Sequence, residues 1–248
     1  MVRATIIVWM LLLGGVLFAA DALWTTAVES YRHSQNWVPF EYEVEQRQVN
    51  GRGTVVSHSL TESRLVSDGN GTWQNEVVSE QFFVGDADSR SPFGSQDEQD
   101  SDDDSDGRFA AVSAHPLDPA MQDRVTVSRV GPGRPLTEGP NGSATVAYRY
   151  VVEPTSDSRA EGTIWLRADT GFPVRLEKRV DPPIMPIKSF TVEHTYESRD
   201  EYWISTDMSF AVTGRLFFVE RHVEMNLDLH DHRYHPEAAA ALQMGAGR

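Results

Sequence analysis

Cysteine is absent from all 248 residues of the chain. No disulfide can therefore cross-link the fold, and no thiol can act as a nucleophile, a metal ligand or the attachment point of a lipid anchor. A chain of this length can be stable through its hydrophobic core alone. Because 40% of the residues are hydrophobic and the length is short of two full domains, we expect one sizeable domain.

Recognisable catalytic signatures are also missing. The sequence contains neither the G-x-S-x-G pattern of a nucleophile elbow nor the H-E-x-x-H pattern of a zinc protease. The densest chemical cluster is DLHDHRYH, in which His230 and His232 share one face of a strand and Asp228 and His235 lie nearby. That spacing permits zinc or copper binding, although a polar strand end is the more common origin of such a cluster. We predict no enzyme, no cofactor and no metal.

Long apolar runs are absent after the N-terminal one. Residues 1–22 carry a single Arg near the start, an apolar run over 4–19 and small residues at Ala20 and Ala22. This order predicts a secretory signal peptide that is cleaved after Ala22. An uncleaved membrane anchor is the alternative, although the run is shorter than the ~20 residues of a spanning helix and contains two glycines. A secretory signal in a chain without cysteine favours a soluble periplasmic protein.

Negative charge is concentrated in one segment. The net charge is -15 at pH 7, and residues 86–106 contribute -8 of it, from nine acidic residues and Arg90. We expect a solvated, self-repelling and disordered loop there. A calcium site is the alternative, but the segment lacks the defined loop pattern with a distal bidentate Glu. An acidic surface also argues against a nucleic-acid partner.

Two-residue periodicity marks most of the remaining chain. Phe40, Tyr42 and Val44 alternate with glutamates, as in a strand with one wet face. Further strand-like runs cover 54–66, 72–84, 124–130 and 144–153. The sequence therefore predicts a mainly β protein, built from antiparallel strands with one apolar face each.

The stretch GTIWLRADTGFPVRLE, residues 162–177, reads as a hairpin with a three-residue loop in which Gly171 is left-handed. The expected cross-strand pairs are Ala168–Phe172, Leu166–Val174 and Ile164–Leu176. The opposite, solvent-facing side then carries Trp165, Arg167, Arg175, Glu177 and Arg179.

A second hairpin is predicted near the C-terminus, after the alternating run from Phe190 to Tyr196, because the apolar set switches parity after Thr213-Gly214. A two-residue turn produces such a switch. The expected pairs are Phe210–Phe217, Met208–Val219, Ile204–Val223 and Tyr202–Met225.

Helices are scarce. One is predicted over about 25–35 and a short turn over 118–124. Residues 236–248 are rich in alanine and offer little apolar surface, so we expect a flexible tail that could begin as a frayed helix at Pro236. Ten or eleven strands with few helices can form a sandwich of two sheets, or one strongly curved sheet around a few helices.

Several features together resemble the periplasmic outer-membrane lipoprotein-sorting proteins of the LolA and LolB superfamily. They are the signal peptide, a short N-terminal helix, the strand FEYEVEQRQ, the hairpin GTIWLRADTGFPVRL and the long last hairpin. The resemblance implies a mainly β fold: a single strongly curved antiparallel sheet, an unclosed half-barrel of about eleven strands, with few helices in the concavity. Residues 23–235 would form this domain.

The resemblance also implies a carrier or sensor that shields acyl chains of lipoproteins or lipids against the apolar face, with membrane-associated proteins as further partners. The candidate lining residues are Phe40, Tyr42, Val44, Val174, Leu176, Phe190, Val192, Tyr196, Ile204, Met208 and Phe210. For each of them, ordinary core packing is the alternative. A non-catalytic β-sandwich interaction module with a fully packed core is the second hypothesis for the whole chain.

Overall fold

A computed structural model describes residues 21–69, 72–84, 106–130, 144–181, 187–216 and 219–245. Residues 1–20 of the predicted signal peptide and nearly all of the predicted acidic loop lie outside these ranges. Asp21 and Ala22, the predicted end of the signal peptide, are described: Asp21 caps the first helix and Ala22 begins it. No helix in the described ranges is long and apolar enough to cross a membrane.

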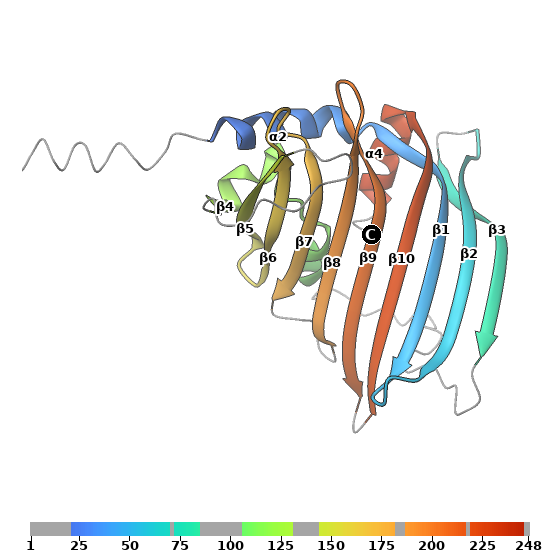
Figure 1. Ribbon diagram of the computed structural model, residues 1–248. Coiled ribbons are helices and arrows are strands. Elements are labelled where there is room, and N and C mark those ends of the chain that lie inside the picture. The colour runs from blue at the N-terminus through green and yellow to red at the C-terminus, as the bar shows by residue number, and fades with distance from the viewer. Residues whose placement is uncertain are drawn as a thin grey trace, which may run out of the picture.

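The described strands form one antiparallel, 10-stranded sheet in the order β3-β2-β1-β10-β9-β8-β7-β6-β5-β4. In chain order the elements are α2 Ala22–Ser34, β1 Trp37–Asn50, β2 Val55–Ser67, β3 Trp73–Val84, α3 Asp106–Ser113, the 3-10 helix η1 Pro119–Arg124, β4 Val125–Arg129, β5 Thr145–Thr155, β6 Ser158–Arg167, β7 Pro173–Asp181, β8 Ile187–Ser198, β9 Trp203–Leu216, β10 Val219–Tyr234 and α4 Pro236–Gly245. The sheet curves without closing, and β3 and β4 remain its edges (Figure 1).

This architecture confirms the predicted half-barrel, with ten strands in the described ranges instead of about eleven. The sandwich alternative is wrong, because all of these strands pair within one sheet. We call the side that faces the helices the concave face, and the opposite side the outer face.

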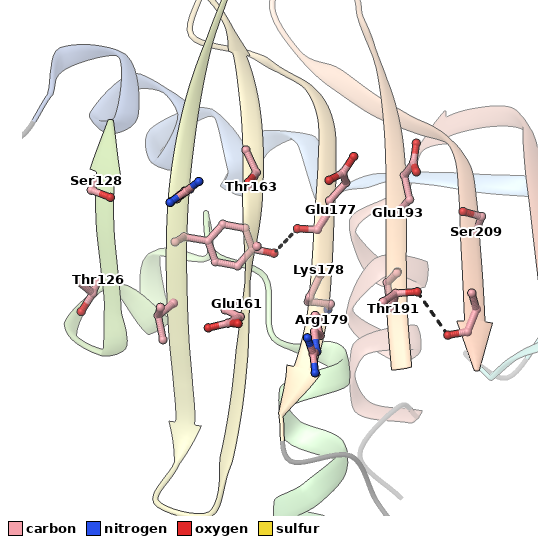
Figure 2. Close-up of a pocket in the computed structure, with 16 residues that line it drawn as sticks. Thr126, Ser128, Glu161, Thr163, Glu177, Lys178, Arg179, Thr191, Glu193 and Ser209 are labelled. Atoms are coloured by element: carbon pink, nitrogen blue, oxygen red, sulfur yellow. Dashed lines mark hydrogen bonds between the residues drawn. The ribbon is translucent and has the colours of Figure 1, made fainter. Parts of the chain in front are cut away.

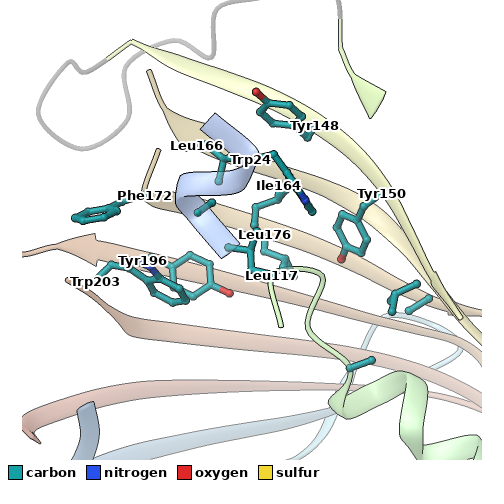
Figure 3. Packing of buried hydrophobic residues seen from close by; sticks show 14 of the residues in the cluster. Trp24, Leu117, Tyr148, Tyr150, Ile164, Leu166, Phe172, Leu176, Tyr196 and Trp203 are labelled. Carbon is teal, nitrogen blue, oxygen red and sulfur yellow. The ribbon is translucent and has the colours of Figure 1, made fainter. Parts of the chain in front are cut away.

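The core lies under α2, α3 and η1, on the concave face of β5–β8 (Figure 3). Trp24 of α2, Leu117 and the strand residues Ile164, Leu166 and Leu176 are buried in it. A fully buried side chain of this size contributes about 1.5–3 kcal/mol. The indole Nε1 of Trp24 also donates to Gln122 Oε1 at 3.1 Å, which ties α2 to η1.

A smaller cluster lies under α4 and corrects the predicted flexible tail. Ala238 and Ala239 of α4 are buried against Val38 and Leu65, and Phe40 and Trp73 pack at the margin. Alanine has too little apolar surface to stabilise a helix alone, but its small size lets the helix approach the sheet closely. The His235 ring caps this helix, since its Nδ1 accepts the N–H of Ala238 at 3.2 Å.

The central hairpin has the predicted apolar face, but its turn differs from the predicted one. Ile164 pairs with Leu176, as predicted, but a register shift pairs Leu166 with Pro173 instead of Val174. The N–H of Arg167 donates to the carbonyl of Phe172 at 2.8 Å, so the loop spans 168–171. Gly171 lies at its end with φ 73°, the left-handed conformation that the loop was predicted to need.

The last hairpin turns later than predicted. Thr213 and Gly214 continue β9 and pair with His222 and Arg221, while Leu216 pairs with Val219. Phe210 therefore faces Met225 and not Phe217. The partner has moved by eight residues, an even number, so the predicted apolar face is unchanged by the error.

Candidate functional site

Cross-strand pairing identifies which side chains belong to the concave face. Lys178 on β7 points toward α3, because its Nζ donates to the carbonyl oxygens of Val112 and Ala114 at the end of that helix. Directly paired residues share a face. The row that contains Lys178 runs across the sheet through Val192, Phe210, Met225 and Gln46.

Neighbouring rows extend this surface into an apolar patch on β8, β9, β10 and β1. We call it the concave stripe. Along each strand its members alternate with outer-face residues, most of which are polar. The members are all half-buried: Tyr42, Val44, Phe190, Met208, Phe210, Val212, Val223, Met225, Leu227 and Leu229.

The described helices leave much of the concave stripe uncovered. Helix α3 contacts β5 and β6, and α4 contacts β1 and β3. In Figure 1 the lower halves of β9, β10 and β1 extend beyond these helices. The half-buried state of the stripe contrasts with Ile164 and Leu176, which have no exposed surface under α2 and α3. The stripe is therefore apolar surface without a full partner in the described part of the chain.

Polar side chains border the stripe on its β2 side. Tyr42, Val44, Gln46 and Gln48 pair with β2 residues that all carry hydroxyls: Ser63, Thr61, Ser59 and Ser57. Next to them, edge strand β3 exposes Phe82, which pairs with Ser59 and is 68% exposed. The concave face thus changes from packed core to apolar stripe to hydroxyl border.

A buried polar network joins the core to the stripe. The N–H of Leu117 donates to His115 Nδ1 at 3.1 Å, so the neutral His115 ring carries its proton on Nε2 and donates to the Tyr196 hydroxyl at 3.0 Å. The His194 ring stacks on Tyr196 with centroids 5.9 Å apart, and His194 pairs with Met208 of the stripe. This network fixes the boundary between the two surfaces.

Burial shifts the pKa of every titratable member of this network toward its neutral form. It lowers the pKa of His194 to about 3, and the nearby Lys178 ammonium lowers it further in the same direction. The pKa of His115 falls well below its usual value for the same reasons, through burial, His194 and Lys178. Burial also lowers the pKa of Lys178 to about 8 and raises that of Tyr196. No described carboxylate forms an ion pair with Lys178.

The outer face holds a second candidate site, a hollow of about 800 Å³ that crosses β4–β9 (Figure 2). We call it the outer trough. Two cross-strand rows line it: Ser128–Arg149–Thr163–Glu177–Glu193–Ser209 and Thr126–Val151–Glu161–Arg179–Thr191–Ala211. Hydroxyl and charged groups dominate these rows, so the trough suits a polar ligand.

Only part of the predicted lining set belongs to the concave stripe. Tyr42, Val44, Phe190, Met208 and Phe210 lie in it. The other six lie elsewhere. Leu176 and Tyr196 are in the main core, Val192 and Ile204 are also buried, and Phe40 packs near α4. Val174 is half-buried beside the register shift between β6 and β7.

Ile204 is the clearest error. A register shift in β9 pairs it with Glu197 of the outer face, whereas Met208 pairs with His194 of the concave face. A bulge adds a residue to one strand and therefore reverses the facing of the residues beyond it. Alternation alone could not reveal this. Conversely, Val223, Met225 and Leu227 belong to the stripe, and their shared parity was the available signal.

The predicted histidine cluster does not converge. His232 Nε2 contacts the carbonyl of Ser205 at 2.8 Å, His235 caps α4 and His230 is exposed. Within the described ranges no group of three His, Cys, Asp or Glu side chains could hold a metal ion.

Three carboxylates instead form a row on the outer face, where Asp228 pairs with both Glu43 and Asp207. Burial, a hydrogen bond with Asp207 and the negative charges of Asp207 and Glu43 raise the pKa of Asp228. A carboxyl with a raised folded-state pKa loses stabilisation as the pH rises. We therefore expect Asp228→Asn to raise the free energy of unfolding at pH 7 by about 0.5 kcal/mol, the scale of a cross-strand like-charge pair.

Urea unfolding at low and high salt measures this effect. Because salt screens exposed charges, the gain should shrink at 1 M NaCl. A gain that is independent of salt would contradict the electrostatic explanation.

Comparisons with known proteins supply no sequence relative: protein-family models give no match, and neither do curated proteins. Among solved structures the chain is similar to a DUF1329 family protein from Desulfovibrio piger, with 15% identity, a TM-score of 0.33, and coverage of 86% of this chain and 92% of that one. It is also similar to LolA superfamily protein NE2245 from Nitrosomonas europaea, with 12% identity, a TM-score of 0.33, and coverage of 86% and 94%.

A weaker similarity is to a chain of the MucA/MucB complex of Pseudomonas aeruginosa. Its identity is 10%, its TM-score is 0.21, and the match covers 90% of this chain and 95% of that one.

Proposed function

We propose that this protein is a non-catalytic, periplasmic lipid-binding carrier or sensor that holds acyl chains of lipids or lipoproteins against the concave stripe. The observation that carries the proposal is the stripe itself: ten half-buried apolar residues in adjacent rows, on the face of the sheet that the described helices cover only in part. The predicted signal peptide supports the periplasmic location.

The energetics favour an apolar ligand of extended shape. Each methylene removed from water contributes about 0.8 kcal/mol, so a few methylenes laid along the stripe give a useful affinity. The stripe follows the strands β9, β10 and β1 for several residue pairs, from Tyr42–Leu229 to Val212–Val223. The hydroxyl border on β2 can accept or donate hydrogen bonds to a polar end of the ligand.

Phe210→Asp tests the proposal, because it places a charge in the middle of the stripe beside Met225. We expect the affinity for a fluorescent fatty acid to fall at least about tenfold, since burying an unpaired carboxylate is strongly unfavourable. Fluorescence titration of the purified full chain measures the change, and native mass spectrometry with lipid extraction identifies any ligand that copurifies.

Ser209→Asp is the matched control. Ser209 is the next residue of β9 and lies on the outer face, in the trough row with Glu193. The control should bind the fatty acid like the wild type. Equal binding by a folded Phe210→Asp variant, or no uptake of fatty acid by the wild type, would refute the proposal.

A further inference from the structure

We infer that the outer trough is a separate binding site for a linear acidic glycan, one that carries carboxylates on alternate sugars. The trough lies on the face opposite the concave stripe, because its rows contain Glu177 and Arg179, which flank the helix-facing Lys178 in β7. Its volume of about 800 Å³ is in the range of ligand sites. It does not depend on the lipid proposal.

The carboxylates of the trough already have partners. Glu161 Oε2 lies 2.9 Å from Arg159, and both Glu177 and Glu193 lie 2.8 Å from nitrogens of Arg175. Two arginines outside the trough lining, Arg159 and Arg175, therefore offset two of these three negative charges. The net charge of the trough then depends on its remaining charged residues on the outer face, Arg149 and Arg179.

Two guanidinium groups remain available. Arg149 on β5 and Arg179 on β7 are exposed members of the trough, and neither forms an ion pair with a residue in the described ranges. A guanidinium group presents a planar fork of donors that matches a carboxylate. The trough thus offers two carboxylate-binding positions.

The spacing of the two arginines favours a repeating ligand. One strand, β6, separates β5 from β7, which places Arg149 and Arg179 about 9.6 Å apart across the strands. Because they lie in adjacent rows, two residues apart along the strands, the distance between their Cα atoms is about 12 Å. A linear glycan with an acidic group on every second sugar presents carboxylates at a comparable repeat. The trough crosses six strands, about 24 Å in all, which leaves room for several sugars.

The remaining lining groups favour sugar over peptide. Thr163 of β6 pairs with Arg149 of β5. Ser128, Thr191 and Ser209 continue the hydroxyl surface toward both ends (Figure 2). Hydroxyls pair well with sugar hydroxyls. A bound peptide would require apolar side-chain pockets or unpaired strand backbone, whereas this trough lies on a sheet face whose strands are already paired with one another.

Titration of the full chain with a hyaluronan hexasaccharide tests the inference, with chitin hexasaccharide as the uncharged probe of equal length. We expect measurable binding of the acidic probe, much weaker binding of the neutral one, and weakening of the former by salt. The double substitution Arg149→Gln and Arg179→Gln should reduce affinity by about tenfold or more, because it removes two hydrogen-bonding charges.

Arg52→Gln is the control, since Arg52 is exposed in the turn between β1 and β2 and is not a lining residue. Its affinity should match the wild type. Unchanged binding by the double variant, absence of binding by the wild type, or equally tight binding of polyglutamate would each overturn the inference. Fatty-acid uptake by the double variant should remain normal, which separates this site from the concave stripe.

Discussion

Gly162→Ala should lower the free energy of unfolding by about 3 kcal/mol, because the added methyl group has no room between β6 and β7. A Cβ atom at Gly162 would lie 1.8 Å from the carbonyl oxygen of Glu177 and 2.9 Å from the Tyr150 hydroxyl. The first contact is with backbone, so relief requires β7 to move away from β6. Tyr150 opposes that movement, because its hydroxyl donates to the same carbonyl at 3.2 Å (dashed in Figure 2).

Urea unfolding of the variant measures the loss, and Gly51→Ala is its control. A Cβ at Gly51 has only ordinary contacts, 3.8 Å from Cβ and 3.9 Å from the carbonyl oxygen of Glu220. The control should stay within about 0.5 kcal/mol of the wild type, as for an unconstrained surface position. If the two variants were equally stable, the close approach of β6 and β7 at this point would be wrong.

Acidification should destabilise the protein through its buried imidazoles. The folded-state pKa of His194 is about 3, below the ordinary value of 6.5, so the unfolded chain binds more protons between these limits. Stability from this group is complete above pH 6.5 and is lost as the pH falls toward 3. The loss for His194 alone is on the order of 2 kcal/mol between pH 6.5 and 4.5. The lowered pKa of His115 adds to it.

His194→Phe isolates this contribution, because it keeps an aromatic ring against Tyr196 and removes the titration. We expect its free energy of unfolding, measured in urea at pH 6.5, 5.5 and 4.5, to fall less steeply than that of the wild type. His230→Asn replaces an exposed histidine and should keep the wild-type slope. Parallel slopes for the wild type and His194→Phe would show that His194 is not the buried base described here.

Protonation of His194 should also affect ligand binding, because His194 lies at the boundary between the core and the concave stripe. It pairs with Leu176 of the core on one side and with Met208 of the stripe on the other. A charge on this ring would face both the Lys178 ammonium and the apolar stripe. Fatty-acid binding and stability are therefore expected to weaken together in acid.

Alternation in the sequence was sufficient to predict the strands and most of their apolar faces, since a side chain in a strand can face only one of two sides. The same logic predicted Gly171 in its left-handed turn and the opposite faces of Ile164 and Trp165. Alternation left a sandwich of two sheets and one curved sheet both open, and only the family resemblance implied the single sheet. The error in the last hairpin left the apolar face intact, because the true pairing differs from the predicted one by an even number of residues.

The tertiary structure alone decided which apolar residues are core and which form a surface. Leu176 and Met208 have the same character in the sequence, but α2 and α3 cover the first and leave the second half-buried. The tertiary structure also placed Ile204 on the outer face, through a register shift that alternation does not reveal. It brought together the arginines of the outer trough, Arg149 and Arg179, which are 30 residues apart in the sequence. Burial depends on what packs above a residue, and that contact is made by segments distant in the chain.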